Sequence, residues 1–169
     1  MNKSTYLYSI NEDAFFSEYA EVEDNSMGAI TVWNFLSKKY FRVPFSKLIQ
    51  DDKEEMVWNL INYEHLPIDE KILLASTFDG AYIKKEDLHY LAIAISTLYE
   101  RGLVGNYESQ LKAIIKMAKN PNSIAFCWDH NPSYQYYWGD IESKRHLSEY
   151  EFFDIMKIPS IQYDIKKKG

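Results

Sequence analysis

Asp129 and His130 are the neighbouring residues whose types best suit acid–base or metal chemistry. They directly follow the apolar run 123–128, which predicts a buried strand, and loops at strand ends hold a large share of functional residues. A carboxylate and an imidazole can exchange protons near neutral pH, and both can bind a metal ion. A metal or hydrolytic site needs more converging groups, so an enzyme built here would need a further carboxylate, such as Asp140 or Glu142.

Other residue types that carry chemistry form no recognisable motif. Cys127 is the single cysteine and lies between Phe126 and Trp128, a setting that predicts a small buried hydrophobe rather than a reactive thiolate. The four histidines are far apart in the sequence and make no HExxH pattern, and the six glycines form no phosphate-binding loop. We therefore expect no cofactor, no bound metal and no intrachain disulfide.

A strongly acidic stretch occupies residues 11–24, which hold six acidic residues and no basic one. Aromatic and apolar residues interleave with these acids. One interpretation is the solvated face of a helix. The other is a negative surface that steers and holds a cationic partner. The acidic candidates for that surface are Glu12, Asp13, Glu18, Glu21, Glu23 and Asp24.

Aromatic residues concentrate between positions 126 and 138, where six lie within 13 residues around Asp129 and His130. Tyrosine and tryptophan are enriched where proteins meet other proteins. A hairpin would place alternate residues on opposite faces, so one face could be core and the other exposed; all of them could also be core. The candidates for partner binding in this stretch are Asp129, His130, Tyr134, Tyr136, Tyr137 and Trp138.

The overall charge disfavours nucleic acid as a partner. The chain has 169 residues, with 19 basic and 25 acidic ones, a net charge of −6 and a pI near 5.2. Proteins that bind nucleic acid usually present a basic face. The mean hydropathy is −0.41, no apolar stretch reaches the length of a membrane span, and residues 1–13 lack a signal-peptide pattern, so we expect a cytoplasmic protein.

Hydrophobic spacing predicts one compact α+β domain over residues 1–169, mainly helical with a small, mostly antiparallel sheet. Residues 68–78 fit a helix better than a hairpin turning at Asp79-Gly80, although both remain open. The lysines at 166–168 and Gly169 are expected to form a frayed basic tail. The predicted helices cover 26–43, 86–101, 106–120 and 148–158, with another starting at Asp51 or Asp52, and the predicted strands cover 5–10, 123–128, 134–138 and 160–165.

Residues 73–95, together with the 123–128 strand and Trp138, resemble small bacterial proteins, some of which are similar to immunity proteins of polymorphic and contact-dependent toxin systems. The resemblance covers less than half of the chain. It implies a cytoplasmic protein that binds and neutralises a toxin domain. The residues that carry it are Thr77-Phe78-Asp79, Asp87-Leu88, Trp128 and Trp138.

The sequence therefore leads to one main hypothesis and two alternatives. The main hypothesis is a stoichiometric protein-binding inhibitor that occludes the active site of a cationic toxin domain, such as a nuclease, through the acidic and aromatic stretches. One alternative is a small hydrolytic or metal-dependent enzyme that uses Asp129 and His130. The other is a structural or regulatory subunit whose partner the sequence does not identify.

Overall fold

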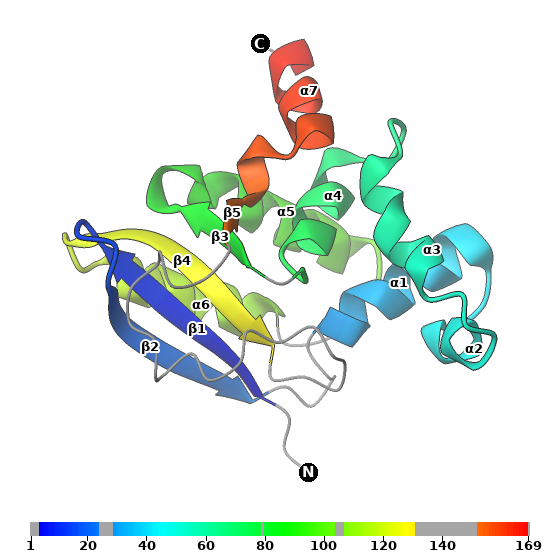
Figure 1. Cartoon of the computed structure of the whole chain (residues 1–169), viewed down its shortest axis with the longest axis horizontal. Coiled ribbons are helices and arrows are strands. Elements are labelled where there is room, and N and C mark those ends of the chain that lie inside the picture. The colour runs from blue at the N-terminus through cyan, green and yellow to red at the C-terminus, as the bar shows by residue number, and fades with distance from the viewer. Residues whose placement is uncertain (1–3, 24–28, 79, 104–106, 131–151, 169) are drawn as a thin grey trace.

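The computed structural model describes residues 4–23, 29–78, 80–103, 107–130 and 152–168 (Figure 1). It is an α+β fold, as predicted, in which helices pack on a five-stranded sheet. The strand order is β2-β1-β4-β3-β5, and all neighbours are antiparallel except β3 and β5. The strands are β1 (Ser4–Asn11), β2 (Phe16–Glu23), β3 (Ala81–Lys84), β4 (Ser123–His130) and β5 (Phe153–Asp154).

The helices lie mainly on one side of this sheet. Helix α6 lies behind β1 and β4, and α4 and α5 lie side by side next to β3 and β5 (Figure 1). Short 3₁₀ turns at 59–62, 85–87 and 155–157 connect these elements. The helices are α1 (Ala29–Phe41), α2 (Phe45–Gln50), α3 (Glu55–Trp58), α4 (Ile68–Ala75), α5 (Leu88–Glu100), α6 (Tyr107–Ala118) and α7 (Pro159–Lys168).

The two faces of the sheet have different surroundings because side chains alternate along each strand. On the helix side, Leu7, Phe126 and Trp128 belong to one continuous core to which every helix contributes. A smaller cluster covers the opposite side, which we call the outer face. Its buried members are Tyr8, Ile10, Ala125 and Cys127, and its partly buried members are Tyr6, Phe16, Tyr82 and Phe152.

The long periodic elements are confirmed. Helices α1, α5 and α6 and strands β1 and β4 occupy the predicted segments, and α1 ends before Pro44 as expected. Residues 68–75 are helical, so the helix was the right alternative for this segment. Gly80 then turns the chain with a φ of 79°, a value that glycine adopts without strain, and leads into β3, which was not predicted.

Three segments differ from the prediction. Asp52 has a φ of 55° and does not begin a helix; the short helix α3 begins at Glu55. A helix was predicted over 148–158, but residues 153–154 pair with β3 and residues 155–157 form a 3₁₀ turn. This turn is favoured locally because the Asp154 carboxylate accepts the N–H of Met156 at 3.0 Å.

The C-terminal segment 160–165 is part of helix α7, not the predicted strand. Pro159 was interpreted as the end of a preceding helix. It is instead the first residue of α7, a position where the fixed φ of proline suits a helix and its missing N–H costs nothing. The lysines at 166–168, predicted to be frayed, continue the same helix.

Helix α4 carries two neighbouring charged residues that are fully buried. Glu70 accepts hydrogen bonds from Lys39 Nζ at 2.5 Å and Tyr40 Oη at 2.6 Å, both from α1. Burial and the hydrogen bond to Glu70 raise the pKa of Tyr40 above its ordinary value. Lys71 forms an ion pair with Asp164 of α7 at 2.8 Å. Helix α4 is therefore held to α1 and to α7 by separate polar contacts.

Candidate functional site

The acidic stretch is a β-hairpin edge and not the face of a helix, so that interpretation was wrong. The turn after β1 is fixed by Asn11, whose side-chain oxygen accepts the N–H groups of Asp13 and Phe15, each at 3.0 Å. Ala14 takes a φ of 67° in this turn. Glu12 and Asp13 are exposed at the tip of the turn. The hairpin thus presents the first two acidic candidates to solvent.

Strand β2 carries the next acidic candidates along the edge of the sheet. Glu18 and Glu21 are exposed, and Glu23 is the last residue of the strand, paired with Ser4. Tyr19 between them is 58% exposed and Phe15 just before the strand is 48% exposed. Large aromatic side chains are enriched at protein interfaces. Asp24 lies outside the described residues.

A row of aromatic side chains crosses the outer face of the sheet from β2 to β3. Tyr8 contacts Phe16 and Tyr19, with ring centroids 5.5 and 5.9 Å apart. Phe152 contacts Phe16 at 6.2 Å and Tyr82 at 6.5 Å, in edge-on geometry. The exposed ring of Tyr19 is therefore backed by a packed aromatic row, which reduces the conformational entropy that it would lose on contact with a partner.

The aromatic stretch 126–138 divides between core and undescribed residues. Phe126 and Trp128 are fully buried on the helix side of β4 and offer no surface to a partner. The four aromatic candidates of this stretch lie outside the described residues, as do both carboxylates considered for an enzyme and the predicted strand 134–138. These residues are Tyr134, Tyr136, Tyr137, Trp138, Asp140 and Glu142.

Asp129 lies on the outer face, two residues after Cys127 and opposite Tyr6 of β1. It is half-buried, and burial raises its pKa to about 6. His130 is the final residue of β4 and pairs with Thr5. The predicted strand 123–128 is longer in the structure, so Asp129 and His130 belong to β4 and not to a loop that follows it. A carboxyl group with this pKa can accept or donate a proton near neutral pH, although raised pKa values also occur without a catalytic role.

Cys127 lies in the middle of the sheet and is fully buried, as predicted. Burial raises the pKa of its thiol well above the ordinary value, and the neighbouring Asp129 adds to this effect. The thiolate is the nucleophilic form, so this cysteine is unsuited to covalent catalysis. Over the described part of the chain, no three His, Cys, Asp or Glu residues come together in a way that could hold a metal ion.

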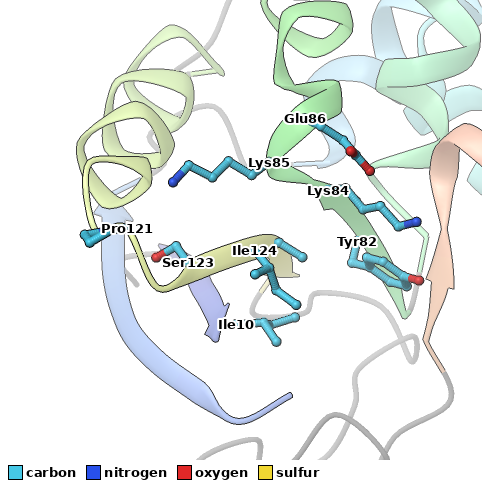
Figure 2. Close-up of a pocket in the computed structure, with 9 residues that line it drawn as sticks. Ile10, Tyr82, Lys84, Lys85, Glu86, Pro121, Ser123 and Ile124 are labelled. Carbon is cyan, nitrogen blue, oxygen red and sulfur yellow. The ribbon is translucent and has the colours of Figure 1, made fainter. Parts of the chain in front are cut away.

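A groove of about 630 Å³ lies beside the outer face, between the start of β4, the end of β3 and the turn after α6 (Figure 2). Its apolar part consists of Ile10, Ile124 and Ala125. Figure 2 shows Lys84 and Lys85 extending in opposite directions from the end of β3. Sequence reasoning missed this groove because β3, a strand of only four residues, was not predicted.

The polar groups of the groove are already engaged within the fold. Lys85 Nζ donates to the carbonyl of Asn120 at 3.3 Å, and Lys84 Nζ lies 3.9 Å from Asp154 Oδ2. Burial and the negative charge of Asp154 also raise the pKa of Tyr82. The charged lining of the groove is Lys84, Lys85 and Glu86, and both lysines interact with groups of the fold itself.

Exposed acids and exposed aromatics coincide along the edge of β2, and we call residues 15–21 the acidic edge. None of the helices in the described part of the chain is long and apolar enough to cross a membrane. Comparison of the chain with protein-family models, with curated proteins and with solved structures finds no match in any of the three.

Proposed function

We propose that this protein is a stoichiometric protein-binding inhibitor, an immunity protein that neutralises a cationic bacterial toxin domain such as a nuclease. The observation that carries the proposal is the acidic edge. It exposes Glu18 and Glu21 beside Tyr19 on a strand at the rim of the sheet. Carboxylates would occupy the sites that the toxin uses for phosphate groups, and the aromatic ring would pack beside them.

The physical properties of the whole chain fit such a role. A net charge of −6 favours rapid encounter with a basic protein, because complementary potentials steer diffusion. An inhibitor of a nuclease acts where the nucleic acid is, so we place the protein in the cytoplasm. The inhibitor itself would contact neither nucleic acid nor membrane.

The decisive experiment is to co-purify the tagged protein from its native host and identify what binds it at a one-to-one ratio. We expect the captured protein to be a basic toxin domain. Its activity should fall linearly as the inhibitor is added and should reach zero at a one-to-one molar ratio. The double variant Glu18→Gln, Glu21→Gln should lower the association rate by about 10-fold at low salt, and high salt should reduce the difference. The dissociation rate should change much less.

Glu100→Gln is the matched control, because Glu100 is an exposed glutamate on α5, away from the acidic edge. It should leave the association rate unchanged. Equal association rates for the double variant and for Glu100→Gln would contradict the acidic edge as the contact surface. A purified protein with no protein partner, or with an acidic one, would contradict the proposed function.

A second candidate is a small hydrolytic enzyme with Asp129 as its acid or base, favoured by the pKa of about 6 of this carboxyl group. Asp129→Asn should then abolish activity on a substrate and leave binding of a protein partner intact. Activity that follows the protonation of a group with this pKa would support the enzyme. An inactive wild-type protein that still binds a toxin would exclude it.

A further inference from the structure

The groove between β3 and the start of β4 has the size and the apolar surface of a site for a small molecule. Its volume of about 630 Å³ lies within the usual range of ligand pockets, roughly 300–1,000 Å³. Of its apolar residues, Ile10 and Ala125 are buried. Ile124 is 42% exposed, although β4 is an interior strand of the sheet. Covering this side chain with an apolar ligand is therefore favourable.

Lys85 supplies the charge that selects the ligand. Its ammonium group donates to the carbonyl of Asn120 at 3.3 Å, and among the described residues no carboxylate lies within ion-pair distance of it. Lys85 is half-buried, and a partly buried cation is stabilised when an anion binds beside it. A lysine ammonium has three N–H donors, so two of them remain for an anion.

The charged side chains of the groove divide between its two sides. Figure 2 shows Lys85 extending toward the turn after α6, where its contact with Asn120 lies. Lys84 and Glu86 extend the other way, and the ammonium group of Lys84 lies 3.9 Å from the carboxylate of Asp154. The groove therefore combines a cation that has no ionic partner among the described residues with apolar surface next to it.

We propose that this groove binds a small amphipathic carboxylate, with its carboxylate group on Lys85 Nζ and its apolar chain along Ile124 and Ile10. A single carboxylate matches a single unpaired ammonium group. A phosphate dianion needs more donors than Lys85 supplies, and it would be repelled by Glu86, which also lines the groove. The groove shares no residue with the acidic edge, so this inference does not depend on the proposed function.

The test is a titration of the whole protein, labelled with ¹⁵N, with octanoate. Octanol has the same chain without the charge, and acetate has the charge without the chain, so these two are the matched probes. We expect octanoate to shift the amide signals of residues 82–86 and 123–125, with a Kd below about 1 mM. Octanol and acetate should each bind at least about 10-fold more weakly, because each lacks one of the two contacts.

Two substitutions test the two contacts separately. Lys85→Gln should weaken octanoate binding by about 10-fold and leave octanol binding unchanged, whereas Lys116→Gln, at an exposed lysine of α6 outside the groove, should change neither. Ile124→Glu places a carboxylate in the groove and should abolish octanoate binding. Ile115→Glu is its control, because Ile115 is exposed on α6 and does not line the groove. Circular dichroism establishes that each variant is folded.

Three results would overturn the inference. Equal affinities for octanoate and octanol, or full octanoate affinity in Lys85→Gln, would show that the carboxylate is not recognised. Signal shifts that survive Ile124→Glu would place the binding site outside the groove. Groove signals that move with protein concentration alone, before any octanoate is added, would identify a second copy of the chain as the occupant.

Discussion

Asp129 is the residue whose titration should be easiest to detect in the stability of the protein. Burial raises its pKa from an ordinary value of 3.8 to about 6, so the folded state disfavours the charged form. The favourable contribution of the neutral Asp129 side chain to the free energy of unfolding is therefore complete below about pH 4. It decreases as the pH rises and is lost above about pH 6. Asp129→Asn should stabilise the fold by about 1–2 kcal/mol at neutral pH, after allowing for partial exposure, and by almost nothing near pH 4.

Urea unfolding of both proteins across this pH range measures the effect. The difference in unfolding free energy between variant and wild type should increase with pH. Its midpoint should lie between the ordinary pKa of 3.8 and the raised pKa of about 6. Asp13→Asn is the control, because Asp13 is exposed in the hairpin turn. A pH-independent difference for Asp129→Asn would mean that burial does not perturb this carboxyl group.

Helix α7 depends on a buried ion pair as well as on apolar packing. Lys71 Nζ is fully buried and lies 2.8 Å from Asp164 Oδ2 and 3.3 Å from the carbonyl of Ser160. Ile161 adds one fully buried side chain from α7. Asp164→Ala should destabilise the protein by about 2–4 kcal/mol, because the buried ammonium loses its only carboxylate within ion-pair distance among the described residues.

Adding Lys71→Met to Asp164→Ala gives the matched test, since it removes the uncompensated charge. The double variant should recover most of the lost unfolding free energy, and hydrogen exchange in α7 should return toward the wild-type rate. A double variant that is less stable than Asp164→Ala would show that the methylene groups of Lys71, and not its charge, hold this contact.

The elements differ in how far the sequence determines them. Helices α1, α5 and α6 were predicted because each repeats an apolar face over three turns or more. Helix α7 was not predicted, because it is fixed largely by its contact with Lys71 and by the burial of Ile161. Strand β3 was not predicted, because it has only four residues. A helix face was one of the two interpretations of residues 11–24, because the acids of β2 concealed the alternation of Phe16 with its neighbours.

The candidate site was predicted in its composition but not in its geometry. The acids of residues 11–24 and the position of Asp129 at a strand end could be recognised from residue types alone. That β2 forms the rim of the sheet depends on strand order, which arises from contacts between β1 and β4, more than 100 residues apart. Local patterns contain no information about such a pairing.

The whole molecule shares one continuous core, which makes its unfolding cooperative. Every helix and strands β1 to β4 contribute buried residues to it, and β1 and β4 also carry the outer-face cluster. A local opening of the sheet would therefore expose both clusters. We expect a single unfolding transition, with fluorescence of Trp33, Trp58 and Trp128 changing together with the helical circular dichroism.

Cys127 provides an independent probe of this cooperativity, because the chain has one cysteine and it is fully buried between β1 and β3. An aromatic disulfide reagent should label it very slowly in the native protein, since burial both blocks access and raises the pKa of the thiol. Labelling should accelerate with urea at the same midpoint as the loss of helical signal. A Cys127→Ala, Ser96→Cys variant, with its thiol on the exposed face of α5, should react fast throughout. Labelling of Cys127 well below the helical midpoint would show that β4 separates from its neighbours while the helices persist, and the sheet and helices would then be distinct folding units.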